Sequence, residues 1–194
     1  MKEQAGWRTI DIVIASIIAV ASGVIFWAWN IVWGATEGAF AFFPPAQTLL
    51  YGVWLIPAVL AGLIIRKPGA ALFTETVAAT ISALLGAKWG ATVIPQGLVQ
   101  GLGAELVFAA FRYRTWNLPV AALAGLGTGV SAALFDFFAW NAAYELWGYR
   151  IPYALLTILS STLIAGVGSW LLVRALAPTG VLDRFAAGRQ RTLV

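Results

Sequence analysis

The residues of this chain with the clearest chemical potential are two acids, Glu75 and Asp136, which lie inside long apolar stretches. A charge at the centre of a bilayer costs about 3 kcal/mol or more, so such acids face protein or water and mark functional sites. The chain contains no His and no Cys, which excludes thiol nucleophiles, imidazole acid–base catalysis, disulfides and Cys/His metal sites. We therefore predict a binding site with no catalytic residue, no metal and no cofactor.

Aromatic side chains gather directly after Asp136, in the segment 138–154, "FAWNAAYELWGYRIPYA". Its tryptophans and tyrosines are Trp140, Tyr144, Trp147, Tyr149 and Tyr153. Each aromatic face attracts a cation by about 0.5–2 kcal/mol once water is excluded, and a carboxylate can neutralise the charge or accept from an amine. An acid among many rings favours a cationic aromatic ligand, although sugars also stack on Trp.

The elements that would position these residues are membrane-spanning helices. Hydrophobic residues make up 61% of the chain and charged residues 10%, whereas soluble domains carry about 25% charged residues. A spanning helix needs about 20 mostly apolar residues, and Pro, Gly or charge separates six such runs. We predict an all-α membrane protein, a six-transmembrane-helix bundle in one domain (1–194), with helices at about 10–33, 46–65, 70–88, 93–111, 117–142 and 152–176 and a cytoplasmic tail at 177–194.

Cations are distributed unevenly between the two sides that these helices define. The termini and the even-numbered connections hold ten Lys and Arg, from Lys2 to Arg191, whereas the other side holds only Lys88 and Arg150. Because cytoplasmic loops carry the excess of Lys and Arg, both termini are predicted to be cytoplasmic (N-in/C-in). The aromatic segment 138–154 then faces the outside.

Polar and aromatic side chains recur at helical spacing, most of them in the outer half of the predicted bundle. Positions three, four or seven apart share one face of a helix, and polar groups in lipid turn inward. The stripes predict an aromatic-walled cavity that opens to the outside, with the connection 34–47 lying over it as a lid. The candidate ligand-binding residues are Trp33, Glu37, Tyr51, Trp54, Glu75, Trp89, Gln96, Gln100, Asp136, Trp140, Asn141 and Tyr144.

Some of the polar residues have a structural interpretation as well. Glu75 lies one or two turns from the cytoplasmic end and could pair with the basic residues 66–67. Glu105 lies off the polar stripe of its own helix, which favours a structural role or a place in a partner interface. Asn30 and Gln47 are as compatible with hydrogen bonds between helices as with a ligand.

The run "YGVWLIPAVLAGLIIRKPGAALFTET" (51–76), followed by "WG" and by "QGLGAELVFAAFRYR" (100–114), resembles the YkoE family. Its members are S components, the substrate-capture subunits of energy-coupling factor (ECF) transporters, and the resemblance covers roughly residues 10–175. It implies uptake of thiamine or its pyrimidine precursor through the plasma membrane of a prokaryote by a chain that is not an enzyme. The implied partners are a transmembrane T component and ABC ATPase subunits, which agrees with the absence of a P-loop from this sequence.

The family motifs place several of the candidate residues in recognisable blocks, namely Tyr51, Trp54, Glu75, Trp89, Gln100 and Glu105. Family members often carry a second acid where this chain has Ser82. The resemblance then implies either that another acid, such as Asp136 or Glu37, takes that role or that the ligand is a related compound.

S components often dock their T component through small residues on the first helix. Ala15, Ala19 and Gly23 recur here at four-residue spacing, which lets another backbone approach closely. We predict this stripe as the partner interface, with packing inside the chain as an equal alternative. Asn30 and Trp33 fall on the same stripe, so a partner face below and a pocket above would require a kink near Gly23 or a tilted helix.

Two other classes of function remain compatible with the composition. A small self-sufficient transporter or channel for an organic cation would need no partners, and an internal repeat, which would favour it, is not evident. A membrane enzyme without His or Cys would need paired acids, and Glu75 and Asp136 are predicted at different depths. Both rank below a vitamin-binding subunit.

Overall fold

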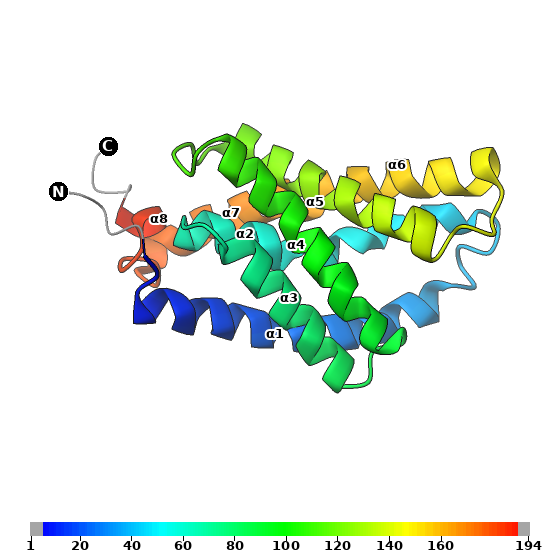
Figure 1. Ribbon diagram of the computed structural model, residues 1–194, viewed down its shortest axis with the longest axis horizontal. Helices are drawn as coiled ribbons and strands as arrows, with labels where there is room; N and C mark the ends of the chain where they lie inside the picture. Colours follow the sequence, from blue (N-terminus) through cyan, green and yellow to red (C-terminus); the bar gives the residue numbers. More distant parts are fainter. Residues whose placement is uncertain (1–5, 190–194) are drawn as a thin grey trace.

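Helices account for the architecture of this protein, which the computed structural model describes for residues 6–189, and the two ends of this described chain lie at the same end of the bundle (Figure 1). Within that range there is no β-strand. The α-helices are α1 (Thr9–Thr36), α2 (Ile56–Ile65), α3 (Ala70–Leu84), α4 (Val93–Ala110), α5 (Leu118–Ala139), α6 (Ile151–Ser160), α7 (Ser169–Leu176) and α8 (Ala186–Arg189). Between them lie the 3₁₀ helices η1 (Pro44–Leu55), η2 (Gly90–Thr92) and η5 (Ala177–Thr179), and the π-helices η3 (Leu146–Arg150) and η4 (Ser161–Gly168).

Five helical runs among the described residues are long and apolar enough to cross a membrane: Thr9–Thr36, Pro44–Ile65, Gly90–Ala110, Leu118–Ala139 and Leu146–Thr179. The protein is therefore a multi-pass membrane protein. The helix predicted at 70–88 is shorter, because α3 ends at Leu84 and the chain turns at Gly86, which has a φ of 89°. Its 15 residues span about 22 Å, less than the hydrocarbon core of about 30 Å. The six spans and the N-in/C-in orientation remain predictions.

The first half of the second span is a 3₁₀ helix of 12 residues rather than an α-helix. Side chains three apart eclipse one another in a 3₁₀ helix. Pro45, Thr48, Tyr51 and Trp54 accordingly form one buried row. Ser160 on α6 anchors this unusual segment, because its Oγ receives a hydrogen bond from Gly52 N (2.9 Å) and donates one to Leu49 O (2.7 Å).

The small-residue stripe on α1 packs inside the molecule, so the prediction of Ala15, Ala19 and Gly23 as a partner interface is wrong. Both alanines are completely buried in the isolated chain. A Cβ on Gly23 would lie 2.5 Å from Ile81 Cβ and 2.9 Å from Ala78 O on α3. Close packing of two helices needs small residues as much as docking does. A kink near Gly23 is therefore not needed to separate a partner face from the pocket, because Asn30 and Trp33 lie on the same stripe and the whole stripe faces inward.

Substituting Gly23→Val should therefore destabilise the isolated protein, with no partner present. The added methyl groups would push α1 away from Ile81, and overpacking of this kind costs about 1–3 kcal/mol. Thermal unfolding in detergent, followed by circular dichroism, measures the loss. Gly34→Ala is the matched control on the same helix, because a Cβ at Gly34 meets nothing within 4 Å. Equal melting temperatures for the two variants would contradict the internal packing.

Glu105 has a structural role, one of the two predicted for it. Its carboxylate accepts hydrogen bonds from the backbone N of Gly69 (2.7 Å), Ala71 (3.0 Å) and Leu72 (3.2 Å) at the start of α3. The Tyr113 hydroxyl donates a fourth bond, of 2.7 Å. Burial, together with this bond to Glu105, raises the pKa of Tyr113 above its ordinary value, so the hydroxyl remains a donor. One side chain of α4 thus holds the first turn of α3.

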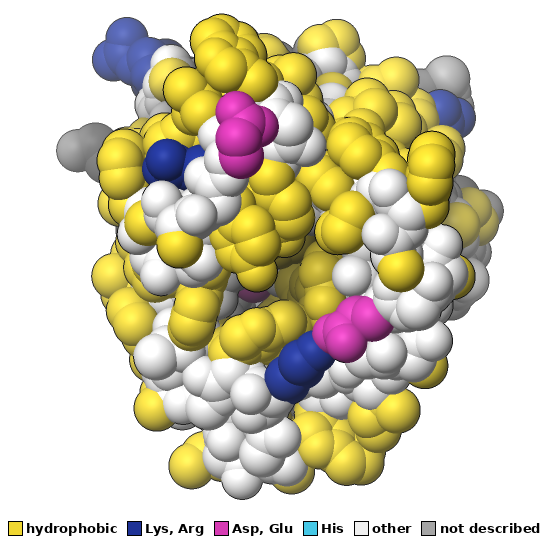
Figure 2. All heavy atoms as spheres, turned by 90° about the vertical axis from the view of Figure 1, so that its right-hand side faces the viewer, with side chains coloured by type: hydrophobic (Ala, Val, Ile, Leu, Met, Phe, Trp, Pro, Cys, Tyr) yellow, Lys and Arg dark blue, Asp and Glu magenta, His cyan; other side chains and the backbone are white. Residues whose placement is uncertain are grey.

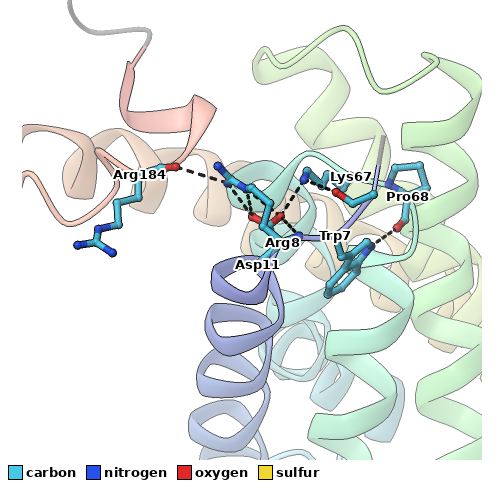
Figure 3. A network of polar contacts seen from close by, with 7 residues as sticks. Trp7, Arg8, Asp11, Lys67, Pro68 and Arg184 are labelled. Carbon is cyan, nitrogen blue, oxygen red and sulfur yellow. Dashed lines mark hydrogen bonds and ion pairs between the residues drawn. The ribbon is translucent and has the colours of Figure 1, made fainter. Parts of the chain in front are cut away.

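Asp11 holds together the end of the bundle that carries the termini (Figure 3). It is completely buried and forms ion pairs with Arg8 (2.7 Å) and Lys67 (2.8 Å). Trp7 Nε1 donates to Pro68 O at 2.8 Å beside it. The start of α1 is therefore tied to the connection between α2 and α3. The basic residues at 66–67 pair with Asp11 and with backbone carbonyls, not with Glu75 as one prediction had it.

The segment predicted as a cytoplasmic tail, 177–194, folds back onto this end as far as residue 189. Leu182 and Phe185 are buried there, and the guanidinium of Arg8 lies 5.9 Å from the Phe185 ring. Residues 1–5 and 190–194, which include Lys2 and Arg191 of the charge count, lie outside the described residues.

Candidate ligand-binding site

A cavity with a volume of about 370 Å³ lies at the end of the bundle opposite the termini. It is formed by the C-terminal third of α1, the whole length of η1, the last turns of α3 and α5, the connection after α3, the first turns of α4, and the aromatic segment before and within α6. Figure 2 faces this end and shows the hollow among mostly hydrophobic side chains, with an acid and a base side by side at its rim. Sites for small organic ligands start at about 300 Å³.

Asp136 forms the acidic pole of the cavity and is 1% exposed. Its Oδ1 accepts a hydrogen bond from Gln96 Nε2 (2.7 Å), and its Oδ2 accepts one from the Tyr153 hydroxyl (2.8 Å). Gln96 and Gln100 also donate to the Tyr51 hydroxyl, at 2.8 and 3.1 Å. Helices α4, α5 and α6 and the 3₁₀ helix η1 thus meet in one polar network.

No cation forms an ion pair with Asp136 within residues 6–188. The ion pairs there join Asp11 to Arg8 and Lys67, and Glu37 to Lys88. Asp136 also lies in the last turn of α5, where the partial negative charge of the helix end disfavours an acid. A buried carboxylate held only by neutral donors is costly to keep, and a cationic ligand would remove that cost.

Three tryptophans form the opposite, aromatic pole. The ring centroids of Trp33 and Trp54 are 5.0 Å apart, those of Trp54 and Trp89 are 5.6 Å apart, and those of Trp33 and Trp89 are 6.3 Å apart. Tyr51 lies edge-on to Trp54 at 5.5 Å and joins this cluster to the acidic pole. Rings from α1, η1 and the connection after α3 therefore offer faces on which a planar cation could stack.

Tyrosines continue from the acidic pole to the surface. Tyr153 and Tyr149 are nearly parallel with centroids 5.9 Å apart, and Tyr149 and Tyr144 stack at 4.1 Å. Tyr144 is 53% exposed, whereas Tyr153 reaches Asp136. The aromatic segment singled out in the sequence thus lines a path from the surface to the acid.

Glu37 and Lys88 form an ion pair at the mouth of the cavity and both line it. Glu37 had been predicted to fix the ligand beside Asp136, but the pairing neutralises its charge. In the predicted lid, 34–47, Pro44 and Gln47 also line the cavity, and Gln47 Nε2 donates to Trp33 O at 2.7 Å. Phe42 of the same segment is fully exposed. The connection therefore borders the mouth without filling it.

Eleven of the twelve predicted residues line the cavity, and Glu75 does not. Glu75 lies one helical turn, about 6 Å along the axis of α3, from Ala79, the nearest residue of this helix that lines the cavity. Glu75 is completely buried there and accepts a hydrogen bond from Ala58 N at 3.0 Å, at the start of α2. The prediction that Glu75 belongs to the ligand-binding site is therefore wrong. In the described part of the chain, no three His, Cys, Asp or Glu side chains group as a metal site would require.

Tyr149 and Tyr153 line the cavity but were not among the twelve predicted residues. The helix predicted at 117–142 ends at Ala139, and the irregular segment that follows has no period from which a face could be derived. Pro152 is the signal that could have identified Tyr153. Pro favours the first turn of a helix, so it predicts that a helix begins here with Tyr153 in its first turn, at the same end of the bundle as Asp136.

The fold and the site define a multi-pass membrane protein with a cavity of small-molecule size at one end. A family model described as "ABC-type cobalt transport system, permease component" matches residues 10–131. The "Putative HMP/thiamine permease protein YkoE" of Bacillus subtilis (strain 168) is 39% identical over 184 residues, which cover 95% of this chain and 92% of that protein. A crystal structure of an S-component of an ECF transporter matches with a TM-score of 0.90 and 38% identity, covering 96% of this chain and 94% of the other. This chain belongs to the YkoE family of ECF-transporter S components.

Proposed function

We propose that this protein captures thiamine or its hydroxymethylpyrimidine precursor from outside the cell for uptake by an ECF-type ABC importer. The observation that carries the proposal is Asp136, a buried acid without a cationic partner in the described chain, at one pole of an aromatic-walled cavity. Thiamine offers a positive charge, an aminopyrimidine that can donate to a carboxylate, and flat rings that can stack on tryptophan. The printed name of the B. subtilis relative supports the same ligands.

The orientation proposed is N-in/C-in in the plasma membrane of a prokaryote. The connections α2–α3 and α4–α5, and the segment after α7, lie at the same end as the termini (Figure 1), and they carry Arg66, Lys67, Arg112, Arg114 and Arg184. The cavity end carries Lys88 and Arg150, of which Lys88 is paired with Glu37. By the positive-inside rule the cavity then faces the medium.

The partners proposed are a transmembrane T component and ABC ATPase subunits, which would supply the energy that this non-enzymatic chain does not. The relation to S components supports this proposal. Isothermal titration of the purified protein with thiamine and with hydroxymethylpyrimidine tests the capture step directly. Saturable binding to one site is expected, and the absence of heat together with the absence of co-purified vitamin would contradict the function.

The Glu37–Lys88 pair should slow the release of a bound ligand. Both side chains are substantially exposed, so breaking the pair with Lys88→Met should cost about 0.4–1 kcal/mol and raise the dissociation rate by about two- to fivefold. Stopped-flow tryptophan fluorescence with thiamine measures this rate. Glu37→Gln should act in the same direction, and the double variant should add little. Opposite effects of the two single variants would mean that each charge acts on the ligand separately, and not as a pair.

A further inference from the structure

Two amide groups in the cavity have hydrogen atoms without an acceptor. Six buried side-chain polar atoms of the described chain lack a hydrogen-bond partner, and among them only Asn30 Nδ2 and Asn141 Nδ2 belong to residues that line the cavity. The other amides of the site are paired: Gln47, Gln96 and Gln100 all donate to protein oxygens. The cavity therefore presents two donors that the protein itself leaves unused.

The backbone fixes the position of Asn141 beside the acid. Asn141 N donates to Asp136 O at 2.8 Å, and Asn141 O accepts from Tyr144 N at 3.1 Å. The side chain is 5% exposed, and its amide approaches the Tyr153 hydroxyl, whose own proton is directed to Asp136; that contact can use only one of the two amide hydrogen atoms. An acceptor, the Asp136 carboxylate, and a donor, the Asn141 amide, thus lie next to each other on one wall.

Asn30 supplies the second free donor, from another element. It lies on α1 and shares the inward stripe with Trp33, one turn away, so it belongs to the aromatic pole. A ligand that enters displaces water from both amides, and it loses affinity if it cannot replace those hydrogen bonds. Sites built around hydrogen bonds reject analogues that leave a buried polar group unpaired.

We propose that Asn30 and Asn141 determine specificity by selecting a ligand that carries hydrogen-bond acceptors beside the group that faces Asp136. This inference rests on the proposed function and deepens it. An aminopyrimidine has the matching edge, because its exocyclic amine donates to Asp136 while the neighbouring ring nitrogen accepts from Asn141. The hydroxyl of hydroxymethylpyrimidine accepts from Asn30. A quaternary ammonium ion without acceptors, such as tetraethylammonium, leaves both amides unpaired and is rejected in spite of the aromatic walls.

Titration calorimetry of the full chain in detergent with hydroxymethylpyrimidine and a set of its analogues tests the inference. The probes are hydroxymethylpyrimidine, pyridine analogues in which CH replaces one ring nitrogen, and 4-amino-2,5-dimethylpyrimidine, which lacks the hydroxyl. The wild type should bind the pyridine analogue that lacks the nitrogen next to the amine, and also the dimethyl compound, at least about 10-fold more weakly than the parent. Tetraethylammonium should not compete.

The variants assign each acceptor to its donor. Asn141→Leu should bind the parent about 10-fold more weakly and should no longer distinguish it from the pyridine analogue, while it still rejects the dimethyl compound. Asn30→Leu should show the reverse pattern. Gln47→Leu is the control, because the Gln47 amide is already bonded to Trp33 O and to the Thr36 hydroxyl (3.2 Å), so any effect should be equal for all probes.

The outcomes separate the two proposals. Equal affinity of the wild type for the parent and both analogues would overturn the specificity role, and it would leave vitamin capture intact. Equal losses of affinity for every probe in Asn30→Leu and Asn141→Leu would also overturn the specificity role, since they would indicate a merely structural effect of the substitutions. A wild type that binds none of the pyrimidines would overturn the proposed function and this inference with it. The affinities of the wild type for the parent and the analogues test the inference even if a variant fails to fold.

Discussion

Replacing Asp136 by Asn should reduce the affinity for thiamine about 100-fold or more. The substitution keeps the shape of the side chain but removes the negative charge that attracts the positive charge of thiamine and strengthens the hydrogen bond from its exocyclic amine. Loss of one partner of a buried charge pair costs about 3–5 kcal/mol, and each 1.4 kcal/mol is a factor of ten in affinity. Titration calorimetry of the purified variant measures the change.

The thermal stability of Asp136→Asn without ligand should be unchanged or higher, although its affinity for thiamine falls. Asp136 is held by the neutral donors Gln96 and Tyr153 and by no cation of the described chain, so the empty protein loses little when the charge is removed and gains from the lower cost of burial. Unchanged or higher thermal stability combined with lost binding would identify a ligand-binding acid. Asp183→Asn, on an exposed residue at the other end of the molecule, should change neither property. Unaltered thiamine affinity in Asp136→Asn would contradict the proposed role.

Much of this site could be predicted from the sequence because two physical constraints act together. Polar groups are costly in lipid and must turn inward, and the helical period then decides which of them share a face. Gln96 and Gln100 on α4, Asn30 and Trp33 on α1, and Glu37 directly after α1 line the cavity for this reason. Asp136 could be identified without the helical period, because an acid inside a membrane-spanning stretch is costly and therefore indicates a functional site.

Depth along a helix and pairing between helices could not be predicted in the same way. Glu75 shares a face of α3 with Ser82, which lines the cavity, but it lies one turn deeper than Ala79, the last residue of that helix in the cavity wall. The pairing of Glu37 with Lys88 joins residues 51 positions apart, which no local pattern reveals. The stripe from Ala15 to Gly23 fits docking and internal packing equally, because both need a close approach of backbones.

The 3₁₀ geometry of Pro44–Leu55 is the largest departure from expectation. The helix predicted at 46–65 was treated as α-helical, whereas the observed buried row joins residues three apart. The segment departs from the α-helix because tertiary contacts decide its form: Ser160 bonds to Gly52 N and Leu49 O. Tyr51 and Trp54 both reach the cavity, since a 3₁₀ helix also keeps them on one side.

Replacing Glu105 by Leu should lower the free energy of unfolding by about 3 kcal/mol or more. The carboxylate is the partner of three backbone N–H groups at the start of α3 and of the Tyr113 hydroxyl, and a buried donor left unpaired costs about 1–3 kcal/mol. The turn that carries Tyr113 would also lose support, since Arg112 and Tyr113 have φ values of 56° and 54°, a conformation that L-residues pay to adopt. Denaturation in mixed dodecylmaltoside–SDS micelles, followed by circular dichroism, measures the loss.

A graded series distinguishes this role from a general intolerance of change at the site. Glu105→Gln retains one acceptor oxygen and should fall between the wild type and Glu105→Leu. Glu145 provides a matched comparison, because its carboxylate also accepts from two backbone N–H groups, those of Trp147 and Gly148, but at an exposed position. Water replaces those bonds, so Glu145→Gln should leave the unfolding transition nearly unchanged. If Glu105→Leu unfolded like the wild type, the cap would contribute nothing and α3 would depend only on its packing against α1 and α4.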